Sequence, residues 1–314
     1  MLLCFNWFMN WRALIPRKEK YDIDGREVVI VNKTTTDFSR LGDIILLVCR
    51  TERMAQHFPK LTFVIKPDFS NPVVNSSEIA VGKAVIEMGG KNVDQNAPSF
   101  KQDWNGIIIH ELTHLYHNHR SGIIITFRKM AGRLRTALTP KITSIELANL
   151  ASMRGILFQF SSSLFTEGVA RYNEILSHGE ILFSQELFEQ KYETAFEQVN
   201  KKTEQFLTTL ELLKKKNLKQ SKIDECLSTL YGFFHGLCYS AGYFMVYTII
   251  FIDHETTFED ILLLKPFEFI KKYEQCMKIK SLQPVISATS GDGILDYMKM
   301  LALLTAVVKE IEKR

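Results

Sequence analysis

The sequence is poor in cysteine, and the few cysteines are scattered along the chain. Five occur among 314 residues, an odd number, and no two of them form a C-x-x-C pair. This distribution excludes a disulfide framework and a cysteine-rich metal knuckle. We therefore expect a reducing compartment, and the predicted location is cytoplasmic. The cysteines are Cys4, Cys49, Cys226, Cys238 and Cys276.

An excess of one charge is also missing. The chain has 39 Lys and Arg against 35 Asp and Glu, for a net charge of +4, and the basic residues are spread along it. Nucleic-acid-binding proteins usually gather basic residues into a patch or arm, so we expect no nucleic-acid partner. Internal repeats and low-complexity tracts are absent as well, which excludes solenoid architectures.

Signals for export or membrane insertion are weak. Residues 1–20 begin with an apolar run but lack the basic segment and small-residue cleavage site of a signal peptide. Residues 229–252 contain no Asp, Glu, Lys or Arg and are long enough to cross a bilayer, but three glycines and four tyrosines dilute their apolarity. We expect this segment to be a buried helix, so a membrane partner is not expected.

The pattern of apolar residues changes near residue 105. Before it, β-branched runs alternate with one helical pattern, which predicts a mixed α/β lobe with a small sheet over residues 1–105. From 106 to 314 the periodicity is almost entirely helical. The predicted strands are 26–34, 61–67 and 78–90, the predicted helix is 37–58, and the boundary loop is 91–106.

Four of the eight histidines stand within one short stretch, IIIHELTHLYHNHR, residues 107–120. If residues 105–119 form a helix, His110 and His114 lie one turn apart on one face, and both imidazoles can bind one metal ion. Glu111 lies beside them, where it can accept a proton from an attacking water. This is the H-E-x-x-H arrangement of zinc metallopeptidases, and it predicts Zn²⁺ as cofactor.

Catalytic zinc usually has three protein ligands, so a third ligand is needed. The metzincin pattern requires Gly at 117 and His at 120, but the chain has His117 and Arg120, which excludes that class. We expect His117 to be an outer-shell or solvent-exposed residue and His119 to lie on the surface. The downstream candidate is Glu167 in TEGVARY, followed by Gly168, where another backbone could approach closely.

HELTH followed by TEGVARY resembles the gluzincins, the peptidase MA-like zinc metallopeptidases whose third ligand is a glutamate on a later helix. The segments 239–249 and 265–275 are similar to later helices of such proteins, so the likeness covers roughly residues 60–275. It implies an α+β fold with a zincin-like active-site cleft between the α/β lobe and the helical lobe.

The resemblance also implies a ligand set and a mechanism. His110, His114 and Glu167 would bind the metal, and Glu111 would act as general base in peptide-bond hydrolysis. Because 52 residues separate His114 from Glu167, Glu174 and Glu146 stay open as alternative ligands.

The remaining parts of the implied site concern the substrate. An oxyanion donor would come from Tyr239 or Tyr243, with His235 as a further candidate. The backbone of a peptide or protein substrate would pair with the free edge of residues 81–89.

Two other functions fit the same residues. A non-catalytic protein of this fold could serve as a scaffold or binding module, although an intact Glu111 argues against it because its role would be chemical. An integral membrane metallopeptidase would use residues 229–252 as a span. The sequence leaves the substrate and the oligomeric state open.

Overall fold

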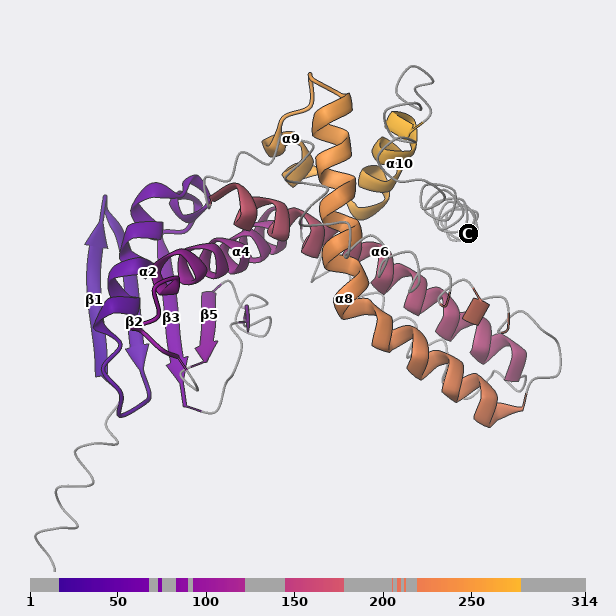
Figure 1. The fold of residues 1–314 in the computed structure, drawn as a ribbon, viewed down its shortest axis with the longest axis horizontal. Helices are drawn as coiled ribbons and strands as arrows, with labels where there is room; N and C mark the ends of the chain where they lie inside the picture. Colours follow the sequence, from indigo (N-terminus) through magenta and orange to yellow (C-terminus); the bar gives the residue numbers. More distant parts are fainter. Residues whose placement is uncertain are drawn as a thin grey trace, which may run out of the picture. The chain divides into compact units, whose positions relative to one another are not determined.

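The computed structural model confirms the α+β class, with a mixed sheet and helices followed by a mainly helical region (Figure 1). The described residues before 122 together with 173–177 form one compact unit, and the others form a second. Each unit is described by itself. The predicted division between 105 and 106 stays a prediction, because a compact unit need not fold alone. The structure describes residues 17–67, 73–74, 83–89, 93–121, 145–177, 205, 208–209, 212 and 219–277.

The first unit contains a five-stranded sheet in the order β1-β2-β3-β5-β4. β2, β3 and β5 are parallel to one another, and β1 and β4 are antiparallel to their neighbours. The parallel strands carry buried runs of valine, isoleucine and phenylalanine, as sheets covered by helices do. The strands are β1 Arg17–Ile23, β2 Arg26–Asn32, β3 Lys60–Lys66, β4 Val73–Val74 and β5 Ala84–Gly89.

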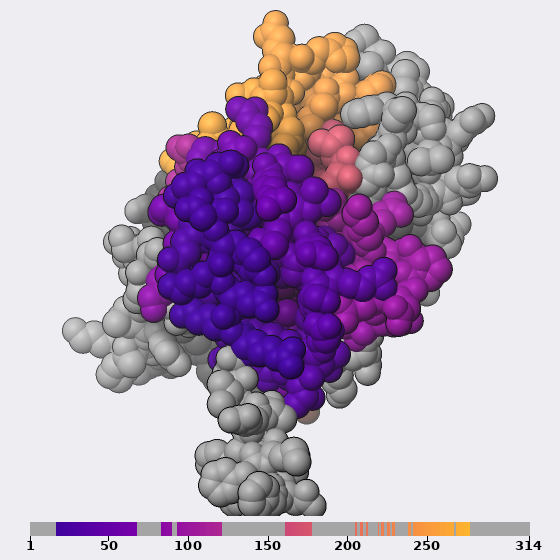
Figure 2. Space-filling model, turned by 90° about the vertical axis from the view of Figure 1, so that its left-hand side faces the viewer, coloured from indigo at the N-terminus to yellow at the C-terminus, as the bar shows by residue number. Residues whose placement is uncertain are grey.

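Strand β1 is a finding that the sequence pattern did not predict. Its first four residues are exposed and mostly charged, so it lacks the apolar alternation of a half-buried strand. A two-residue turn joins it to β2, and Asp24 and Gly25 both have positive φ, at 54° and 79°. Such a turn matches the twist of the two strands. Figure 2 shows this side of the sheet in indigo.

Helices α2 (Ser39–Thr51) and α4 (Phe100–Ser121) pack against each other and against the sheet. The helix predicted over 37–58 is interrupted at Glu52, whose backbone is extended, and continues as the short 3₁₀ helix η1 (Arg53–His57). Helix α4 begins earlier than expected, inside the loop predicted at 91–106.

The edge strand expected at residues 81–89 is not free along its length. β4 pairs with β5 on the side away from β3, with Val73 opposite Glu87 and Val74 opposite Ile86. The sheet therefore ends in β4 at these positions, and the prediction of a free edge there is wrong.

The second unit contains α8 (Gln220–Ile252), α9 (Phe258–Leu263), α10 (Pro266–Met277) and most of α6 (Ile145–Ser177). α6 and α8 meet backbone to backbone at Gly168 and Gly242. A Cβ built on Gly168 would lie 2.2 Å from the Gly242 carbonyl carbon, and one on Gly242 would lie 2.0 Å from the Leu164 carbonyl oxygen. A close approach at Gly168 was expected, but the neighbouring backbone belongs to α8 and not to the histidine-bearing helix.

Among the described residues, no helix combines the length and apolarity that a membrane span requires. This includes α8, which contains the candidate span at 229–252.

The glycine crossing predicts a strong effect of one added methyl group. We expect Gly242→Ala to lower the free energy of unfolding by at least about 3 kcal/mol, because the backbones must separate to admit the Cβ. The measurement is urea unfolding followed by circular dichroism. The control is Gly42→Ala in α2, where the nearest atom to the new Cβ is Ile30 Cδ1 at 3.7 Å. This control should be neutral or stabilise by about 0.5–1 kcal/mol, since alanine favours the helix. Equal stability of both variants would contradict the crossing.

Candidate metal centre

Two histidines of α4 direct their ring nitrogens to one point. His110 Nε2 and His114 Nε2 are 3.1 Å apart, and the two rings are nearly perpendicular at 81°. Two imidazole nitrogens bound to one tetrahedral zinc ion would be about 3.4 Å apart, given Zn–N distances near 2.05 Å. The i, i+4 spacing on a continuous helix thus brings the two nitrogens to nearly the separation that a shared metal ion requires.

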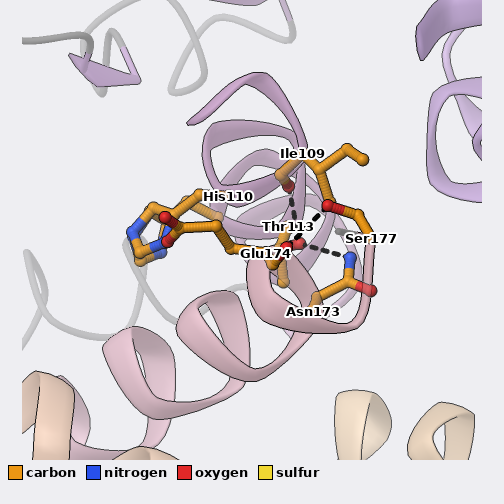
Figure 3. A network of polar contacts seen from close by, with 7 residues as sticks. Ile109, His110, Thr113, Asn173, Glu174 and Ser177 are labelled. Atoms are coloured by element: carbon orange, nitrogen blue, oxygen red, sulfur yellow. Dashed lines mark hydrogen bonds and ion pairs between the residues drawn. The ribbon is translucent and has the colours of Figure 1, made fainter. Parts of the chain in front are cut away.

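The other ring nitrogen of His110 contacts an acid on α6. His110 Nδ1 lies 3.0 Å from Glu174 Oε2, and both side chains are largely buried (Figure 3). A carboxylate only accepts hydrogen bonds, so Nδ1 carries the hydrogen, and in the neutral ring Nε2 keeps its lone pair. This fixes the tautomer that a metal ligand needs, and a carboxylate behind a ligating histidine is common in metal sites. Glu174 was an alternative ligand from the sequence, whereas the structure places it against His110.

A third potential ligand comes from the same helix as Glu174. His110, His114 and Glu167 each offer one ligand atom, and these atoms all lie within 4.8 Å of one another. Glu167 precedes Glu174 by seven residues, about two helical turns, so both acids lie on one face of α6. The donor set of two imidazoles and one carboxylate suits zinc. The three residues could hold a metal ion.

The surroundings of Glu167 differ from those of Glu174. Burial raises the pKa of the Cys238 thiol on α8 well above its usual value, and the charge of Glu167 raises it further. Glu167 thus lies near the α8 segment that crosses α6 at Gly242. The remaining alternative ligand, Glu146, has its side chain outside the described residues.

The other two histidines of α4 occupy different environments. The side chain of His117 is fully buried, so of the two positions predicted for it, outer-shell or solvent-exposed, solvent exposure is wrong. Burial lowers the pKa of His117 to about 3, and the nearby His114 contributes to the shift. His119 is exposed, as predicted, and its ring meets the edge of Phe58 at 5.3 Å between centroids.

The two tyrosines proposed as oxyanion donors lie on α8. Tyr243 is 1% exposed, and its ring packs at 5.9 Å from that of Tyr172. Tyr239 is half-buried. The side chain of His235 lies outside the described residues.

The burial of His117 predicts a pH dependence of stability. The folded state keeps this ring neutral down to about pH 3, whereas the unfolded chain binds a proton below about pH 6.5. Burial of the neutral ring therefore makes its full contribution to the free energy of unfolding above pH 6.5. This contribution decreases from pH 6.5 toward pH 3, by at most about 1.4 kcal/mol per pH unit. We expect His117→Phe to reduce this slope, measured by urea unfolding with a chelator present. His119→Phe is the matched control, and an equal slope in wild type and His117→Phe would contradict the assignment.

Comparisons of the sequence with family models and with curated proteins found no relative. No model of a protein family matches the chain, and no curated protein matches it significantly. The gluzincin resemblance therefore rests on the sequence motifs, chiefly HELTH and TEGVARY. The structure adds a group of two histidines and one glutamate that could hold a metal ion.

Proposed function

We propose that the protein is a zinc-dependent peptidase of the gluzincin type that hydrolyses peptide bonds in peptides or proteins. One observation carries the proposal: His110, His114 and Glu167 bring their ligand atoms within 4.8 Å of one another on the helices that contain HELTH and TEGVARY. Three protein ligands are typical of catalytic zinc, whereas structural zinc is usually held by four.

Each residue of the proposed site would have its own role. His110 and His114 bind through neutral imidazoles, Glu167 binds through its carboxylate, and Glu174 holds the His110 ring in the required tautomer. When bound, zinc polarises a substrate carbonyl and lowers the pKa of water toward neutrality. Glu111 accepts the proton of the attacking water and passes it to the leaving amine, which completes hydrolysis of the peptide bond.

Glu111 is suited to this role by its position. It follows His110 directly on α4 and is 8% exposed, so little bulk water reaches its carboxylate to compete with the attacking water as proton donor. Tyr239 is the better candidate for the oxyanion donor, because it is half-buried whereas Tyr243 is enclosed against Tyr172. An aligned donor of this kind stabilises negative charge that develops on the carbonyl oxygen.

Glu111→Gln tests the chemistry separately from metal binding. We expect this variant to bind zinc like the wild type and to hydrolyse a mixed peptide library at least about 100-fold more slowly, because its amide cannot accept the proton. Zinc is measured by elemental analysis and cleavage by mass spectrometry. Glu52→Gln changes a half-buried carboxylate outside the group of His110, His114 and Glu167 and should keep full activity. Activity of the wild type should disappear with a chelator and return with zinc. If these proteins bind zinc but none of them cleaves peptides, the proposed peptidase activity is wrong and only the metal-binding site remains.

Glu167→Gln and Glu174→Gln test the assignment of the two acids. Loss of an outer partner typically weakens metal binding by roughly 10- to 100-fold, which we expect for Glu174→Gln. Glu167→Gln removes a charged ligand and should weaken zinc binding more. Competition with a chromophoric chelator gives both affinities. The reverse order would make Glu174 the ligand.

A further inference from the structure

A buried hydrogen bond joins the C-terminal end of α6 to the middle of α4. Asn173 Nδ2 donates to Thr113 Oγ1 at 2.9 Å, and Thr113 Oγ1 donates to the Ile109 carbonyl at 2.8 Å (Figure 3). Thr113 is fully buried and Asn173 is 8% exposed. Because the only hydrogen of the hydroxyl goes to Ile109, Thr113 accepts from Asn173, and the contact requires a donor at that position.

In sequence, these two residues are direct neighbours of His114 and of Glu174, the partner of His110. Thr113 stands between His110 and His114 and immediately precedes the second of them, and Asn173 immediately precedes Glu174. The Asn173–Thr113 bond therefore joins the same two helical turns that the Glu174–His110 contact joins.

The apolar side chains of α6 restrict its rotation about the axis, and the polar contacts restrict it further. Ile175 is 4% exposed, but the adjacent Leu176 is 41% exposed. A turn of the helix by one residue, about 100°, would move Ile175 out of the core and would disrupt the close approach of Gly168 to Gly242. The same turn would move Asn173 off Thr113 and Glu174 off His110, and would leave buried polar groups unpaired.

The amide is also enclosed from a second side. Asn173 Nδ2 lies 3.8 Å from the sulfur of Met54 in η1, which is itself 7% exposed and is a weak acceptor. Thr113 is thus the strong acceptor in this contact, so its hydroxyl specifies the position of Asn173. Ser177 Oγ donates to the Glu174 carbonyl at 2.6 Å and satisfies a helix-end acceptor just beyond the contact.

We propose that Asn173 and Thr113 are positioning residues, whose hydrogen bond fixes the last turn of α6 on α4 and thereby holds the Glu174 carboxylate on His110 Nδ1. The inference rests on the proposed zinc site. Its consequence is that metal affinity depends on a pair of side chains that bind no metal.

The test compares Thr113→Val, Asn173→Leu and the double variant in the full-length protein. Replacing both polar partners by apolar groups of similar shape can leave stability nearly unchanged, so the double variant should unfold near the wild-type urea midpoint. Its zinc affinity should nevertheless be about 10- to 100-fold lower, as expected when an outer partner of a ligand is misplaced. Affinity is measured by chelator competition, and the absorption spectrum of the cobalt-substituted protein should change with it.

Two further variants serve as controls. Ile65→Val trims a fully buried side chain of β3, so it should lower the unfolding midpoint and keep the wild-type zinc affinity. Thr113→Ser retains the hydroxyl and should bind zinc like the wild type.

The outcomes separate this inference from the proposed function. A wild-type protein that binds no zinc would overturn the metal site itself. Zinc binding by the wild type with unchanged affinity in the double variant would overturn the positioning role alone. If the double variant does not fold, the comparison of Thr113→Val with Thr113→Ser decides, and equal zinc affinities overturn the inference.

Discussion

The contact between Glu174 and His110 is the interaction on which the metal group depends. Helical spacing alone brings His110 and His114 to one face of α4, but each ring can still rotate and exchange tautomers. With Glu174 Oε2 at 3.0 Å from His110 Nδ1, the lone pair of that ring is confined to Nε2, the atom that faces His114 Nε2. The carboxylate thus fixes which nitrogen of the neutral His110 ring keeps the lone pair, and this nitrogen faces His114.

Helix α6 can supply two acids to this region because different contacts hold different parts of it. Its last turns meet α4 through Asn173 and Glu174. One turn and more before them, Gly168 meets Gly242 of α8 at backbone distance. Glu167 lies directly beside that glycine, so a side chain at 168 would move the segment that carries Glu167. Small residues here permit a helix position that larger residues would prevent.

The sequence predicted the class of fold and the histidines of the metal group, because both follow from local periodicity. HELTH needs only a helix, and runs such as REVVIVN need only a sheet. The sequence favoured Glu167 as the third ligand and left Glu174 open as an alternative, since seven residues return to the same helical face. The partner of Gly168 is a long-range contact with no local signal. Strand β1 was missed because RKEKYDI lacks apolar alternation, although Asp24-Gly25 is a hairpin signal that could have revealed it.

The four histidines of α4 show how far environment, and not spacing, sets the chemistry of a side chain. His117 is three residues after His114 and seven after His110, so a helical projection places it near both. Yet it is fully buried, and burial lowers the pKa of its ring to about 3. His119, two residues later, is exposed. His110 contacts Glu174 through Nδ1, and its ligand atom lies near those of His114 and Glu167. His110 and His114 are therefore the histidines of α4 that, with Glu167, could hold a metal ion.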